Sequence, residues 1–183
     1  LTKAPLNPTN SNTASFTFET SEASTFSCQL DGAALGTPGP CEPDASDPGN
    51  PAKGGKSYSG LGEGAYTFTV TASDTAGNVV SKSFSWVVDV TGPTVAFGTP
   101  SPAANVNGWN NTNVSIPFTI QDSSGVDPAH STASPLVLSS EGGAVTGSVT
   151  ATDNAGNSVS VTSPAVKIDK TPPSAALAVT AGP

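Results

Sequence analysis

Apolar and polar residues alternate along much of this chain, and no stretch repeats apolar residues at helical spacing over three turns. The alternation is clearest at residues 14–19, 25–30 and 67–72, where every second side chain would face a core. It returns at residues 113–120, where Pro117 indicates an edge position or a bulge. The pattern predicts an all-β protein built of short, half-buried strands.

Shorter alternating runs predict further strands at residues 79–88, 94–97, 136–138, 144–151, 158–168 and 175–180. Between the strands, Asp31-Gly32 predicts a turn that needs positive φ, and the proline- and glycine-rich residues 36–56 predict one long polar loop. The run Leu61-x-x-Gly64-x-Tyr66 enters a strand in the manner of a tyrosine corner, whose phenol bonds back to a nearby backbone group.

Two short motifs occur twice and indicate an internal repeat. The turn sequence Asp-x-Ala-Gly-Asn begins at Asp74 and again at Asp153, 79 positions later. A strand that ends in Asp, followed by Thr and Pro, carries Asp89 and again Asp169, 80 positions later. The nearly equal spacing predicts tandem repeats joined at the Asp89 segment.

The length of 183 residues suits two domains of roughly 80 residues each. We expect one domain at residues 1–90, a second at 91–173, and a tail at 174–183 that begins a third repeat. Abundant Gly (19) and Pro (17) with only 11% charged residues fit many short strands joined by turns. The prediction is two tandem immunoglobulin-like antiparallel β-sandwiches in an elongated arrangement.

The charge of the chain argues against two classes of partner. Its formal net charge is −8, with six lysines and no arginine, so we expect no binding to nucleic acid or to anionic membranes. No run approaches the roughly 20 apolar residues of a membrane helix, so we expect no membrane insertion. The chain begins at Leu1 rather than at Met, and we expect it to be a fragment of a longer protein.

The two cysteines, Cys28 and Cys41, both lie in the first repeat, 13 positions apart. They are placed to close a disulfide across the start of the long loop, which would indicate an oxidising compartment. Metal binding by two thiols alone is the weaker alternative, because structural zinc sites use four ligands.

The first repeat carries a set of motifs at residues Phe26-x-Cys28-x-Leu30-Asp31-Gly32, Cys41, Tyr58-x-x-Leu61-x-x-Gly64-x-Tyr66-x-Phe68, Asp74-x-Ala76-Gly77-Asn78 and Trp86-x-Val88-Asp89. On these residues it resembles the bacterial Ig-like repeats of large secreted and surface proteins. The second repeat is similar to a sister type without the cysteines and the tyrosine corner, on Trp109, Asp122-x-x-Gly125-Val126, Asp153-x-Ala155-Gly156-Asn157 and Ile168-Asp169-x-Thr171-x-Pro173. The resemblance implies an extracellular stalk or adhesion role.

Calcium is the one cofactor for which the topology supplies an argument. In a seven-stranded sandwich the B–C and F–G loops lie at the end where the chain enters, and so face the preceding linker. Asp122 and Asp127 fall in the second repeat's B–C turn, and Asp153 and Asn157 in its F–G turn. With Asp89 from the linker they predict an oxygen-rich calcium site at the joint. The alternative is that these residues serve only as turn and linker structure, since Asp caps turns and Gly and Asn accept positive φ.

Other candidate chemistry is weaker. The single histidine, His130, lies in a polar loop without a nucleophile motif, so we expect no enzyme activity. Trp109 is either a sugar-stacking platform or a cover for the end of the second sandwich.

The leading prediction is therefore a non-enzymatic extracellular spacer or adhesion module of a larger bacterial surface or secreted protein, stiffened by calcium at the joint. Its partners would be neighbouring Ig-like repeats of the same chain and a cell-surface protein or glycan. The alternative is an accessory carbohydrate- or protein-binding module of a secreted enzyme. An accessory module should present exposed aromatic side chains, whereas a spacer should not.

Overall fold

The computed structural model describes residues 1–32 and 39–176, and the protein is all-β. Every regular element in these residues is a strand, and nothing in them forms a helix of the length and hydrophobicity needed to span a membrane. The chain divides into two compact units. Unit 1 comprises Leu1–Pro93, Asp122–Asp127 and Thr152–Ser158, and unit 2 comprises Thr94–Gln121, Pro128–Ala151 and Val159–Pro183.

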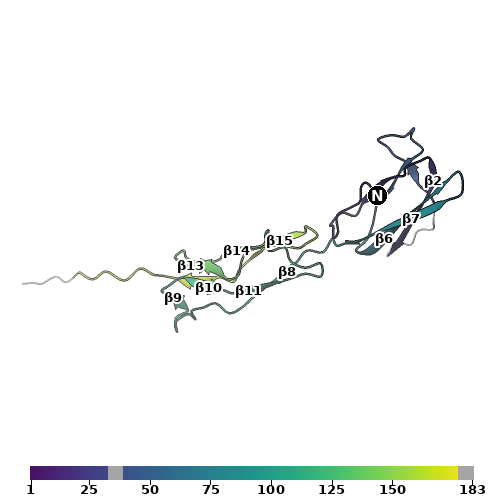
Figure 1. The fold of residues 1–183 in the computed structure, drawn as a ribbon. Coiled ribbons are helices and arrows are strands. Elements are labelled where there is room, and N and C mark those ends of the chain that lie inside the picture. Colours follow the sequence, from purple (N-terminus) through teal and green to yellow (C-terminus); the bar gives the residue numbers. More distant parts are fainter. Residues whose placement is uncertain (33–38, 177–183) are drawn as a thin grey trace, which may run out of the picture. The chain divides into compact units, whose positions relative to one another are not determined.

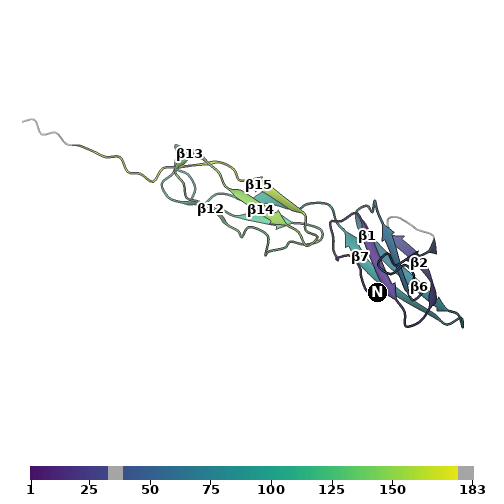
Figure 2. The ribbon, with the colours of Figure 1, turned by 90° about the horizontal axis from the view of Figure 1, so that it is seen from above.

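The strands β1 to β7 of unit 1 lie in two sheets, and β1, β2, β6 and β7 are labelled in Figures 1 and 2. One has the order β1-β5-β4, with bounds Ala14–Glu19, Lys53–Tyr58 and Glu42–Pro43. The other has the order β3-β2-β6-β7, with bounds Gly39–Pro40, Ser24–Gly32, Gly64–Asp74 and Val79–Val88. Lys3 adds a bridge to Thr17 at the edge of the first sheet. This grouping of strands is that of an immunoglobulin-type sandwich.

Aromatic side chains from both sheets form the core of unit 1, as the alternation predicts. Phe16 of β1 stacks on Phe68 of β6 with ring centroids 4.0 Å apart, and Trp86 of β7 meets Phe16 edge-on at 5.3 Å. All three are buried. The Tyr66 hydroxyl donates to the Gly62 carbonyl at 2.9 Å, which confirms the tyrosine corner. The predicted Cys28–Cys41 disulfide is present, with the two Cα atoms 5.2 Å apart.

Two expectations for unit 1 were wrong. Asp31 and Gly32 do not form a turn: they extend β2 and pair with Thr67 and Tyr66, although Gly32 does take the expected positive φ, at 140°. Gly32 is needed there because a Cβ at this position would lie 2.5 Å from the Ala65 carbonyl oxygen.

The long loop expected at residues 36–56 also contains strand structure, although residues 36–38 lie outside the described part. Its last residues, Lys53 to Lys56, belong to β5 and pair with β1. Gly54 and Gly55 suit this strand because a Cβ on Gly54 would lie 2.5 Å from the Phe18 ring. Close packing against an aromatic core therefore overrides the low strand propensity of glycine.

Unit 2 carries the remaining strands and forms shorter ladders than unit 1. The pairs are β8 with β11 (Thr94–Phe97, Phe118–Gln121), β10 with β12 (Val114–Ile116, Leu136–Leu138), and β14 with β15 (Ser148–Thr152, Ser158–Thr162), the tip of this last hairpin being counted in unit 1. A further sheet has the order β13-β16-β9, with bounds Gly142–Val145, Val166–Ile168 and Trp109–Asn110. The core of unit 2 centres on Val114, Ile116, Leu138 and Ile168.

Interruptions explain why the ladders of unit 2 are short. Pro117 separates β10 from β11, as its lack of an N–H predicts. The strands expected as continuous at residues 144–151 and 158–168 are each broken once. At the breaks the Ser163 N–H donates to the Gly147 carbonyl at 2.8 Å, and the Gly147 N–H donates to the Ser163 hydroxyl at 3.1 Å. A side-chain bond thus replaces one rung of the ladder.

Two remaining expectations concern Trp109 and the tail. Trp109 is half-buried, with the Lys167 ammonium 5.7 Å from its ring centroid. No strand covers residues 174–176. The rest of the strand expected at residues 175–180 lies outside the described residues.

Candidate functional site

The linker aspartate, Asp89, follows directly after the last strand of unit 1. Its N–H donates to the Thr9 carbonyl at 2.9 Å, and its Oδ1 accepts the Thr91 N–H at 3.1 Å. The side chain is only 2% exposed, which is unusual for an aspartate. Residues 90–93, which include Gly92 and Pro93, then continue without strand structure. The strand end thus holds one carboxylate in a buried position.

The loop 122–127, also part of unit 1, presents a second carboxylate. Asp122 Oδ1 accepts hydrogen bonds from the Ser124 N–H at 2.7 Å and from the Ser124 hydroxyl at 2.8 Å. Gly125 follows at φ 89°, where an L side chain would be strained. This is an Asx-type turn, and it fixes the direction of the Asp122 side chain.

The loop 152–158, again within unit 1, presents a third carboxylate. Asp153 is 1% exposed, and its Oδ1 and Oδ2 accept the Asn157 N–H and the Asn157 side-chain amide, each at 2.8 Å. Asp74 makes the same two bonds with Asn78 in the first repeat. There the hydrogen bonds, chiefly from the Asn78 side chain, lower the Asp74 pKa. The repeated motif therefore builds the same turn twice.

The three aspartates of unit 1 converge. Oxygen atoms of Asp89, Asp122 and Asp153 all lie within 4.8 Å of one another. Two carboxylates at that separation repel each other by roughly 3 kcal/mol even at an effective dielectric constant of about 20. Within the described residues, no lysine forms a salt bridge with any of them. We call this group the acidic cluster.

One oxygen of the acidic cluster has no partner. Asp89 Oδ2 is buried and makes no hydrogen bond, whereas both oxygens of Asp153 are used in its turn. Turn chemistry therefore accounts for Asp153 but not for Asp89. An unpaired buried carboxylate oxygen is costly, so this atom calls for a ligand.

Asp127 and Asn157, which were also expected in the site, make contacts of other kinds. Asp127 is not a member of the acidic cluster, and its N–H donates to the Thr152 carbonyl at 2.8 Å. Asn157 uses its amide as a donor: Nδ2 bonds to the Asp89 carbonyl at 2.8 Å and to the Thr91 carbonyl at 3.2 Å. Asn157 thus clamps the linker backbone through its side-chain nitrogen.

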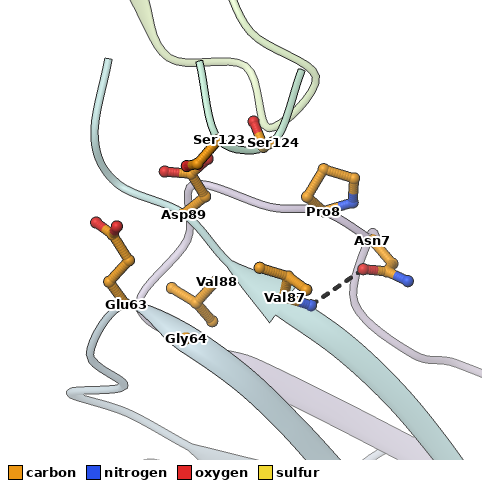
Figure 3. Close-up of a pocket in the computed structure, with 9 residues that line it drawn as sticks. All are labelled: Asn7, Pro8, Glu63, Gly64, Val87, Val88, Asp89, Ser123 and Ser124. Carbon is orange, nitrogen blue, oxygen red and sulfur yellow. Dashed lines mark hydrogen bonds between the residues drawn. The ribbon is translucent and has the colours of Figure 1, made fainter. Parts of the chain in front are cut away.

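A cavity of about 380 Å³ borders the acidic cluster (Figure 3). Its lining is Asn7, Pro8, Glu63, Gly64, Val87, Val88, Asp89, Ser123 and Ser124. Most of these residues were not expected from the sequence, because the segment before β1 and the turn before β6 carry no motif that points to the joint. Asn7 Oδ1 accepts the Val87 N–H at 3.0 Å and holds that segment against β7.

Comparison with known proteins adds little to this geometry. No family model matches the chain, and no curated protein matches it. Among solved structures, the chain is similar to one described as "Structures of Clostridium thermocellum CbhA fibronectin(III)-like modules", with 17% identity over 94% of each chain and a TM-score of 0.39. A TM-score that low assigns neither a domain arrangement nor a function, so the all-β assignment rests on the strands themselves.

Proposed function

We propose that this chain is a non-catalytic spacer module of a larger extracellular protein, and that the joint around Asp89 serves to hold successive repeats in one geometry. The observation that carries the proposal is the clamp on the linker. Asn157 bonds to the carbonyls of both Asp89 and Thr91, and the Asn10 N–H donates to the Ala155 carbonyl at 3.2 Å. A flexible tether would leave these backbone groups to water.

An extracellular location is supported by the Cys28–Cys41 disulfide, since such bonds persist mainly in oxidising compartments.

The alternative, an accessory module that binds carbohydrate or protein, predicts exposed aromatic side chains. All eleven aromatic residues of the chain lie in the described part, and each of them is buried or half-buried. Trp109, the candidate platform, is among the half-buried ones. This distribution favours the spacer over a sugar-stacking module.

Rotational diffusion measured by NMR relaxation tests the spacer. In the wild-type chain, amides of both repeats should report one common anisotropic tumbling if the clamp holds the linker as proposed. In Asn157→Ala, the amides of the two repeats should report different rotational correlation times. The matched control, Asn78→Ala, removes the same side chain from the turn of the first repeat and should leave the common tumbling intact. Independent tumbling of the repeats in the wild-type protein would overturn the proposal.

A further inference from the structure

We infer that the acidic cluster of Asp89, Asp122 and Asp153 is a calcium site. The inference deepens the proposed function by naming the ligand of the same joint, and its effect on the joint rests on that function. Two separate observations carry it: the convergence of three carboxylates within 4.8 Å, and the buried Asp89 Oδ2 that no donor reaches.

The hydrogen bonds around the cluster do not use every lone pair of its carboxylate oxygens. The donors that fix Asp122 and Asp153 come from residues of their own turns, Ser124 and Asn157. Each oxygen of Asp153 accepts one bond from Asn157 and keeps a second lone pair, whereas both bonds to Asp122 fall on Oδ1, so Asp122 would offer its other oxygen. The turns therefore aim the two loop carboxylates, and Asp89 Oδ2 is the oxygen with nothing else to bind.

The donor set selects the kind of cation. All three groups of the cluster are carboxylates, and no histidine or cysteine of the described residues joins them. Oxygen-only sites suit hard cations, whereas zinc and copper prefer nitrogen or sulfur ligands. Calcium accepts irregular shells of six to eight oxygens, completed by carbonyls and water, whereas magnesium demands near-octahedral geometry. Ligands drawn from two turns and a linker fit calcium better.

Bound calcium would connect the linker to the two turns. Asp89 stands on the linker, whereas Asp122 and Asp153 stand on loops of the second repeat. A cation shared by all three replaces their mutual repulsion with attraction. The joint should then be stiffer with calcium than with a chelator, and the Asn157 clamp should act in the same direction.

Calorimetric titration of the full chain with calcium chloride tests the inference. We expect one site with a Kd on the order of 10⁻³ M or tighter, in the range of extracellular modules, and weaker binding of magnesium chloride. Asp89→Asn should weaken calcium binding at least tenfold. Asp169→Asn, the matched change in the second repeat's linker, should leave it unchanged. If Asp89→Asn does not fold, Asp122→Asn in the half-exposed turn should show the same loss.

The results separate this inference from the proposed function. Wild-type protein that binds no calcium at millimolar concentration, or Asp89 and Asp122 variants that bind as tightly as wild type, would overturn the calcium site. Common tumbling lost in Asn157→Ala would still support the spacer in that case. Calcium binding with independent tumbling in both calcium and chelator would instead overturn the spacer and leave the metal site standing.

Discussion

The linker at Asp89 and the corresponding linker at Asp169 share one backbone design. Each aspartate follows the last strand of its repeat, and each donates its N–H at 2.9 Å to a carbonyl of an earlier segment, Thr9 in one case and Asn110 in the other. Each carboxylate also accepts the N–H of the threonine two positions later at 3.1 Å. The Asp-x-Thr motif by itself therefore marks the end of a strand and does not identify a ligand site.

The two linkers differ in what surrounds the aspartate. Asp89 is buried and lies in the acidic cluster, whereas Asp169 is exposed and is not a member of any such group in the described residues. The next residue is Val90 in the first linker and Lys170 in the second. The Lys170 ammonium donates to the Ser139 carbonyl at 2.6 Å. The difference teaches that a linker aspartate becomes a candidate ligand only where other carboxylates reach it.

Of the substitutions that test this comparison between the two linkers, Asp153→Ala should reduce stability the most. It removes a buried acceptor from two donors of Asn157, so the free energy of unfolding should fall by about 1–3 kcal/mol in calcium buffer. Asp74→Ala, in the more accessible copy of the turn, should cost less. Urea denaturation of both variants measures the difference, and equal losses would show that the burial of Asp153 does not matter.

Val90→Lys should transfer one feature of the second linker to the first. Val90 is 51% exposed, so a lysine side chain can extend into solvent there, and the substitution adds a positive charge beside Asp89. Calcium affinity should fall about five- to tenfold through repulsion across several ångströms of high dielectric. Calorimetry at low and high salt checks this, because added salt should shrink the effect. A loss of calcium affinity that is the same at low and high salt would indicate a structural cause.

Thr91→Val and Thr171→Val should have small and similar effects, because they change what the linkers share. Each threonine hydroxyl donates to a glutamate, Glu63 in the first repeat and Glu141 in the second. Each bond is exposed, so its loss should cost about 1 kcal/mol or less. Thermal denaturation of the two variants tests the equivalence. A much larger loss for Thr91→Val would show that this hydroxyl belongs to the acidic cluster.

The Asp74 turn should give the smallest effect, visible mainly in titration. Its hydrogen bonds lower the Asp74 pKa below the ordinary 3.8, so their stabilisation is present above that pH and is lost as the pH falls through the lowered value. Asn78→Ala should raise this pKa toward 3.8, as followed by NMR of the carboxyl carbon. An unchanged pKa would mean that the Asn78 side chain is not the main cause.

Much of the site could be predicted because its parts are local motifs. An Asp-x-Ala-Gly-Asn turn and a strand-ending aspartate are visible in sequence, and sandwich topology says which loops face which linker. The side-chain direction of Asn157 could not be predicted, since its amide can donate or accept. Glu63 was missed because it meets the linker through a fold-level contact with Thr91.

In the fold, as in the site, local patterns could be predicted and contacts between distant segments could not. Alternation predicts β1 and β7 because their apolar residues recur at every second position. It misses Lys53 to Lys56 of β5, whose two glycines carry no side-chain signal. That strand depends on Phe18, which leaves no space for a Cβ at Gly54, and such a contact is known only once the sheets are assembled.

The clamp formed by Asn157 on the linker carbonyls joins two unlike surfaces, a strand end on one side and a pair of turns on the other. Because its two sides differ, a contact of this kind is heterologous rather than two-fold. Under the proposed function, the strand end at Asp169 would be the corresponding half of a further contact of this kind.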